Sequence, residues 1–340
     1  MTPKERLFEV LRGNKVDRKP CICPGGMMNM IVEDIMDIEG VFWPMAHTDA
    51  NMMAELTMGM YKNNTFENFG VPFCMTVEAE GMGAKVYMGT KTTEPRVTEY
   101  PIESVTEWRK LTNIDVNAGR AKVVTDAIKI LKAKNSEVPI IANLTGPVSL
   151  ASSLVEPMIY YKELVKKPKE AHEFMEFVTD NLIAFGRAQL EAGADVLTIS
   201  DPSGTGEILG AKTFSKFAVP YLNKIIDSLK EYAKGGTIIH ICGRLKSIYA
   251  ELNDLHSDAV SFDSITSATQ VAENVKGKAI MGNVSTFAIE NGDRESLTKI
   301  SKQCLETVDI LSPACGIGVR SKLENIKVLT ECAKAEVAVD

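Results

Sequence analysis

The stretch DVLTIS, at residues 195–200, is a short apolar run that ends in a polar residue, and a long amphipathic pattern at residues 170–191 precedes it. A short run without strict alternation is typical of a strand that is buried on both faces of a parallel sheet. The preceding pattern has the length and periodicity of an amphipathic helix. A helix followed by a buried strand is the repeating unit of α/β proteins.

The same unit recurs along the chain. Seven further runs resemble a buried strand, at residues 20–23, 70–74, 139–143, 237–242, 259–263, 279–283 and 309–314. Other helical patterns lie at residues 118–134, 213–234 and 295–307. Eight strands that alternate with helices predict an α/β fold of the (β/α)8 TIM-barrel type rather than a doubly wound open sheet.

The chain contains no linker rich in Pro, Gly and Ser that would divide it. We therefore expect a single barrel domain over residues 1–340. An N-terminal helical segment is expected at about residues 1–65, and an excursion at about residues 75–117 lies between the second and third strands.

The composition excludes several classes of protein. The 340 residues include 38 Lys+Arg and 45 Asp+Glu, which gives a net charge of −7. This acidic balance argues against a nucleic-acid partner, which would require a clustered basic face. No apolar run reaches the ~18 residues that a membrane span needs, and the first residues do not resemble a signal peptide. We expect a cytoplasmic protein with neither a nucleic-acid nor a membrane partner.

The cysteines are seven in number, at positions 21, 23, 74, 242, 304, 315 and 332. An odd number in a long chain without a signal peptide argues against a disulfide framework, so metal binding, catalysis or burial is expected instead. Cys21 and Cys23 lie on the first predicted strand, and Cys304 and Cys332 on helix faces. We expect structural roles for these four and for Cys74.

His240 and Cys242 lie on one predicted strand, within TIIHICG at residues 237–243. Side chains alternate along a strand, so these two point to the same face, with their backbones about 6.6 Å apart. Taken alone, the pair could equally be two buried side chains. Cys315, however, ends the last predicted strand, and the C-terminal ends of all barrel strands meet at one rim. One histidine and two cysteines predict a Zn²⁺ site with a fourth position open to water or substrate.

A zinc ion with two thiolate ligands suits chemistry on a substrate thiol. A free thiol has a pKa of about 8.5 and is mostly protonated at neutral pH. A thiol that coordinates zinc is deprotonated and becomes a nucleophile. The predicted reaction is therefore alkyl transfer to sulfur.

Asp201 and Asp263 end two further predicted strands and are candidate catalytic residues. Either carboxylate could be the fourth zinc ligand, a hydrogen-bond acceptor for His240 or a general base. Either could equally cap a turn at the end of its strand.

Several motifs together resemble a known family. They are HICG (240–243), GNVS (282–285), CGI (315–317) followed by LEN (323–325), Trp43-Pro44 with His47, MGTK (88–91) and EAGAD (191–195). The sequence resembles the uroporphyrinogen decarboxylase superfamily and, within it, the methylcobamide:coenzyme M methyltransferase branch. The resemblance implies a zinc-dependent barrel that moves a methyl group from a methylated corrinoid protein to the thiol of coenzyme M. It also implies that His240, Cys242 and Cys315 are the zinc ligands.

The corrinoid is expected to come from a separate protein. The stretch DLHSDA at residues 254–259 resembles only the start of a cobalamin-binding pattern, and the later motifs are absent from the chain. Methylcobalamin is therefore expected as a substrate that another protein carries.

The sequence departs from the decarboxylase branch after the first strand, where those enzymes carry an arginine-rich motif. Residues 24–30 here read PGGMMNM and contain no arginine, which argues against binding of a porphyrin polyanion. These residues and 204–207 also differ from the methanogen enzymes. The acceptor could therefore be coenzyme M, homocysteine, another thiol or a folate. The alternatives are a decarboxylase-like enzyme and a non-catalytic subunit that binds zinc or docks a corrinoid protein.

Methionine is frequent in the first sixty residues, where Met1 is followed by a cluster of nine of the chain's sixteen, at positions 27, 28, 30, 36, 45, 52, 53, 58 and 60. Methionine packs adaptably in helix cores, and it also recurs at partner grooves. The cluster therefore predicts either residues of the hydrophobic core or a segment that covers the barrel mouth and on which a partner docks.

Overall fold

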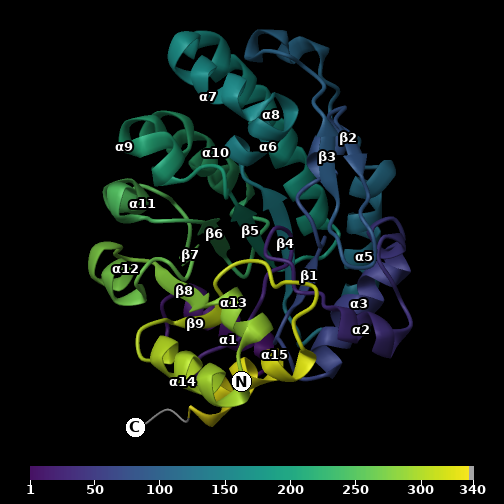
Figure 1. Ribbon diagram of the computed structural model, residues 1–340, viewed down its shortest axis with the longest axis vertical. Helices are drawn as coiled ribbons and strands as arrows, with labels where there is room; N and C mark the ends of the chain where they lie inside the picture. Colours follow the sequence, from purple (N-terminus) through teal and green to yellow (C-terminus); the bar gives the residue numbers. More distant parts are fainter. Residues whose placement is uncertain (337–340) are drawn as a thin grey trace.

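Seven parallel strands form a curled central sheet in the order β1-β4-β5-β6-β7-β8-β9, and helices surround it (Figure 1). The computed structural model describes residues 1–336. The strands span Phe69–Val71 (β1), Ile140–Thr145 (β4), Val196–Ser200 (β5), Thr237–Ile241 (β6), Ala259–Phe262 (β7), Ala279–Val284 (β8) and Ile310–Pro313 (β9). Every residue of β4, β5, β6 and β7 is buried, as expected for strands covered on both faces.

The eighth position of the barrel is filled by residues 20–23, which lie between β9 and β1. The Ile22 N–H donates to the Leu311 carbonyl of β9 at 3.0 Å. On the other side, the side chains of Glu67 and Asn68 accept from the N–H groups of Cys21 and Cys23. The predicted barrel is confirmed, but its first strand is reduced to a single bridge, because side chains replace most of the ladder next to β1.

The helices follow the strands as predicted, with one correction. The patterns at residues 118–134, 170–191 and 295–307 form α5 (Gly119–Lys134), α8 (Pro168–Glu191) and α14 (Arg294–Leu305). The single helix predicted at 213–234 is wrong. The chain instead forms α9 (Gly206–Phe217) and α10 (Val219–Leu229), which meet at Ala218. Pro220, in the first turn of α10, has no N–H to continue the hydrogen bonding of α9.

The remaining helices either cover the barrel or connect its strands. After the sheet strands come α6 (Pro147–Leu154), α7 (Pro157–Lys166), η3 (Lys246–Ile248), α11 (Tyr249–Asn253), α12 (Ala268–Asn274), α13 (Thr286–Asn291) and α15 (Leu323–Ala335). Residues 1–65 contain α1 (Pro3–Leu11), α2 (Glu33–Glu39), η1 (Met45–His47) and α3 (Ala50–Lys62). Residues 75–117 contain α4 (Val77–Gly81), the antiparallel strands β2 (Lys85–Tyr87) and β3 (Arg96–Glu99), and η2 (Val105–Lys110).

Most methionines of the N-terminal region lie in the hydrophobic core. Met28, Met30, Met36, Met53 and Met60 are fully or almost fully buried. Met45, on η1, is exposed. Met27 is half-buried and lies beside the candidate site described below.

None of the helices in the described part of the chain combines the length and apolar character that a membrane crossing requires.

A buried ion-pair network joins residues 20–23 to β1. The Glu67 carboxylate accepts from the Cys21 N–H at 3.0 Å and pairs with the guanidinium groups of Arg18 and Arg6. Burial opposes ionisation of Glu67, but the hydrogen bonds from Arg18 and from the Cys21 N–H outweigh it and lower the pKa of the carboxyl group. The charged form is thus the one that the fold stabilises.

We expect Glu67→Gln to lower the free energy of unfolding by about 3 kcal/mol, because the substitution leaves the guanidinium group of Arg18 without its buried counter-charge and leaves Arg6 paired only with Asp17. The folded-state pKa of Glu67 lies below its unfolded value. The stabilisation is therefore complete above the unfolded pKa and is lost as the pH falls through the folded one. Denaturant unfolding at neutral and acidic pH checks this. If the difference in unfolding free energy between wild type and variant stays the same at acidic pH, the proposed role of ionised Glu67 is contradicted.

Candidate metal centre

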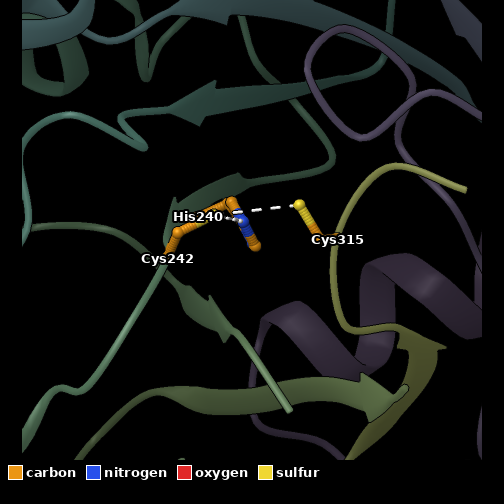
Figure 2. Close-up of side chains that lie close together, drawn as sticks. All are labelled: His240, Cys242 and Cys315. Carbon is orange, nitrogen blue, oxygen red and sulfur yellow. Dashed lines mark hydrogen bonds between the residues drawn. The ribbon is translucent and has the colours of Figure 1, made fainter. Parts of the chain in front are cut away.

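Three side chains from two strand ends meet at the C-terminal rim of the barrel (Figure 2). His240 lies on β6, Cys242 follows that strand and Cys315 follows β9. His240 Nε2 lies 3.1 Å from Cys242 Sγ, and Cys242 Sγ lies 3.8 Å from Cys315 Sγ. All three candidate ligand atoms lie within 4.8 Å of one another. Residues 73 positions apart in the sequence therefore form one compact group of donors.

The imidazole of His240 is oriented by the neighbouring strand. Its Nδ1 lies 2.9 Å from the hydroxyl of Ser261, which is opposite it in the register of β6 and β7. The Ser261 hydroxyl in turn donates toward Met28 Sδ, so its oxygen can accept from an Nδ1–H. That arrangement leaves the lone pair on Nε2, on the side of Cys242, where a metal would bind. Sequence reasoning missed Ser261, because its contact depends on the register of two strands.

The two thiols differ in how readily they ionise. The hydrogen bond from Cys242, together with the contact to His240, lowers the pKa of Cys315. The same hydrogen bond, burial and the charge of Cys315 raise the pKa of Cys242. One thiolate is therefore favoured, and a second one 3.8 Å away is not unless a cation joins them.

The donor set fits zinc. A tetrahedral site with Zn–S distances of about 2.3 Å has S···S edges of about 3.8 Å, and the two cysteine sulfurs are 3.8 Å apart. One imidazole and two thiolates leave one position open, as in catalytic zinc sites. Within residues 1–336, no fourth His, Cys, Asp or Glu joins this group.

The two candidate aspartates lie in different surroundings. Asp201 is fully buried, and its carboxylate accepts from the N–H groups of Val148 and Ser149 at the start of α6. Burial raises its pKa, partly offset by these hydrogen bonds. This position gives Asp201 a helix-capping role, and a catalytic role for it stays a prediction. Asp263 is half-buried after β7, where its negative charge contributes to the raised pKa of Cys242.

Glu94 is a second residue that sequence reasoning missed. Its side chain is exposed, and the protein atoms around the carboxylate remove part of its hydration. This desolvation, with the nearby charge of Cys315, raises the pKa of Glu94 to about 7. A carboxyl group that titrates near neutral pH can take up or release a proton beside the thiol site. Glu94 lies in the excursion predicted at about residues 75–117. The sequence does not show where this segment lies relative to the rim of the barrel.

Residues 24–30 enter the barrel mouth next to the three donors. Gly26 has a φ of +61°, and a methyl group added there would lie 2.7 Å from Cβ of Asn143 on β4. The Asn143 amide donates to the Pro24 carbonyl at 2.8 Å. Only glycine permits this close approach. The loop thus reaches the site with methionine side chains and without an arginine.

We expect Ser261→Ala to weaken zinc binding by about 10-fold, because the imidazole of His240 loses the hydrogen bond that orients it. Ser312→Ala is a matched control, since Ser312 is also fully buried, on β9, and its hydroxyl donates to the Pro313 carbonyl. Competition with a chromophoric chelator measures both affinities. Equal zinc affinities for the two variants would show that Ser261 does not contribute to zinc binding.

Comparisons with known proteins place the chain in a family. The sequence model described as Uroporphyrinogen decarboxylase (URO-D) matches residues 2–336. The methylcobamide:CoM methyltransferase MtbA of Methanosarcina acetivorans is 34% identical over 336 residues, which cover 98% of each chain. The methylcobamide:CoM methyltransferase MtaA of Methanosarcina barkeri is 32% identical over 338 residues, with 96% of each chain covered.

A solved structure extends this similarity to three dimensions. A methyltransferase from Methanosarcina mazei matches the fold with a TM-score of 0.91 at 31% identity, covering 98% of this chain and 99% of that one. The chain therefore belongs to the uroporphyrinogen decarboxylase family, as its motifs predicted.

Proposed function

We propose that this protein transfers a methyl group from a methylated corrinoid to the thiol of coenzyme M. The convergence of His240, Cys242 and Cys315 at the barrel rim is the observation that carries this proposal. Relatives that share a third of their residues with this chain over almost its full length are named methylcobamide:CoM methyltransferases. The absence of arginine from residues 24–30 favours this branch over decarboxylation of a porphyrin polyanion.

His240, Cys242 and Cys315 would hold a zinc ion. Bound there, zinc would supply a Lewis acid that keeps the substrate thiol deprotonated at neutral pH. Ser261 orients the imidazole of His240 through Nδ1. The half-buried sulfurs of Cys242 and Cys315 leave the site open toward the mouth, where a thiol and a corrinoid can meet.

The reaction is an in-line displacement at the methyl carbon. The thiolate sulfur attacks that carbon, and a sulfur–carbon bond forms as the carbon–cobalt bond breaks. The electron pair of the broken bond stays on cobalt, which becomes Co(I), and the thiol proton leaves to solvent. We propose that a separate protein carries the corrinoid. The seven free cysteines agree with a reducing compartment such as the cytoplasm.

A methyl-transfer assay with free methylcobalamin and a panel of thiols tests the function. Zinc-loaded protein should form cob(I)alamin and the methyl thioether of coenzyme M, and homocysteine should react more slowly. If homocysteine is methylated faster than coenzyme M, homocysteine is the better candidate for the methyl acceptor. Zinc binding without any methyl transfer would instead favour a non-catalytic subunit, and carbon dioxide release from uroporphyrinogen would favour a decarboxylase.

A further inference from the structure

Two consecutive methionines contact the candidate metal centre from the loop that enters the mouth. Met27 Sδ lies 3.7 Å from Cys315 Sγ. Met28 Sδ lies 3.8 Å from the Ser261 hydroxyl that orients His240. Met28 is fully buried, whereas Met27 is half-buried, like Cys242 and Cys315. Met27 therefore lies on the accessible side of the group.

The backbone holds Met27 close to Cys315. The Ile317 N–H donates to the Asn29 carbonyl at 2.8 Å, and the Asn29 side chain donates to the Ile317 carbonyl at 3.1 Å. Gly316 lies directly against this loop, since a methyl group added there would be 2.6 Å from the Met27 carbonyl oxygen. The two segments are thus joined by hydrogen bonds two residues beyond Met27 and Cys315, and they are in close backbone contact at Gly316. The proximity of the two sulfurs follows from backbone contacts rather than from a flexible side chain alone.

The distance between these sulfurs suits two ligands of one metal ion. Met27 Sδ to Cys315 Sγ is 3.7 Å and Cys242 Sγ to Cys315 Sγ is 3.8 Å. Both match the edge of about 3.8 Å expected between two sulfurs on a tetrahedral zinc. The described residues offer no fourth His, Cys, Asp or Glu to the group. Thioethers are soft donors of the class that accompanies thiolates in zinc and copper(I) sites.

We infer that the Met27 thioether is the fourth ligand of the metal when no substrate thiol is bound, and that the substrate thiol displaces it. This inference rests on the zinc site of the proposed function. In the exchange, the bond from metal to Met27 Sδ breaks, a bond from metal to substrate sulfur forms, and the thiol proton passes to solvent. A neutral thioether is a weaker ligand than a thiolate, so the exchange favours the substrate.

The chemistry of the product gives this ligand a second use. Methyl transfer turns the substrate thiolate into a thioether, which is the same kind of donor as Met27. Met27 then competes with the product on equal terms, and it has the advantage of being tethered beside the site. The return of Met27 would therefore speed product release and keep water off the metal between turnovers.

X-ray absorption at the zinc edge tests this inference on protein labelled with selenomethionine. Thiol-free protein should show one selenium neighbour in the first shell, and saturating coenzyme M should remove it. The labelled Met27→Leu variant should lack this neighbour. The labelled Met30→Leu variant should keep it, because Met30 Sδ contacts Thr57, on α3, instead of the metal centre.

The same experiment separates the inference from the proposed function. Zinc with two sulfurs, one nitrogen and one oxygen, and no selenium, would overturn the ligand role of Met27 and leave the proposed site intact. A protein that binds no zinc would overturn both. Thiol titration adds an independent readout. Met27→Leu should bind coenzyme M about 3-fold to 10-fold more tightly, since the thiol no longer competes with a bound side chain. An unchanged or weaker affinity would contradict displacement.

Discussion

Cys315→Ala should release the zinc and reduce methyl transfer to coenzyme M by at least about 100-fold. Loss of a hydrogen-bond partner outside the ligand shell already costs about 10–100-fold in metal affinity, and loss of a ligand should cost more. Cys315 is also the only one of the three donors that does not come from β6 or its end. Of the three donors, the variant keeps only His240 and Cys242, which lie on the same strand end and so would hold a metal ion from one side only.

Zinc content after dialysis and the rate of methyl transfer measure this effect. Cys332→Ala is the matched control, because it makes the same chemical change on α15, away from the three donors. That variant should retain zinc and activity. Thermal unfolding should show that Cys315→Ala still folds, since Cys315 is only half-buried. Full zinc affinity in Cys315→Ala would show that the site uses other ligands.

Gly70→Ala should be the most destabilising single methyl addition to the sheet, at about 3 kcal/mol. A methyl group at Gly70, on β1, would lie 1.9 Å from the Pro24 carbonyl oxygen. That oxygen cannot move away freely, because it accepts a hydrogen bond from Asn143 at 2.8 Å. The loop that carries Met27 begins at Pro24, so displacement there should also disturb the metal centre.

Denaturant unfolding and zinc titration together check this expectation. Gly119→Ala is the control, because Gly119 has a φ of +53° but no atom within 4 Å of an added methyl group. It should cost only about 1–2 kcal/mol from backbone strain and leave zinc binding unchanged. If Gly70→Ala unfolds at the wild-type denaturant concentration and binds zinc normally, the close approach of β1 and Pro24 is not required.

The barrel and the meeting of His240, Cys242 and Cys315 at its rim were predictable because they depend on local patterns. Apolar runs that alternate with amphipathic stretches identify buried strands and their helices, and seven of the eight runs form strands of the sheet. Alternation along β6 places His240 and Cys242 on one face. The common rim of barrel strands brings Cys315 to them. None of these steps requires knowledge of a specific long-range contact.

Other elements could not be predicted from local patterns, because distant groups decide them. The run at 20–23 was expected as a regular strand, but Glu67 and Asn68 supply side-chain partners in place of a ladder. By contrast, the helix expected at 213–234 divides at Ala218 for a local reason, because Pro220 in the first turn of α10 has no N–H to continue the hydrogen bonding of α9. The hydrogen bonds of the Asp201 carboxylate to the start of α6 likewise depend on a distant segment, and its catalytic role stays a prediction.

The sequence by itself determined the fold class, the family and the types of donor at the rim, because periodicity and strand alternation are properties of neighbouring residues. Only the tertiary structure decided what surrounds those donors. Ser261 reaches His240 through the register of two strands. Met27 reaches Cys315 because glycines and hydrogen bonds bring a loop from the first thirty residues against the last strand. Such contacts depend on the packing of segments far apart in the chain, which local patterns do not encode.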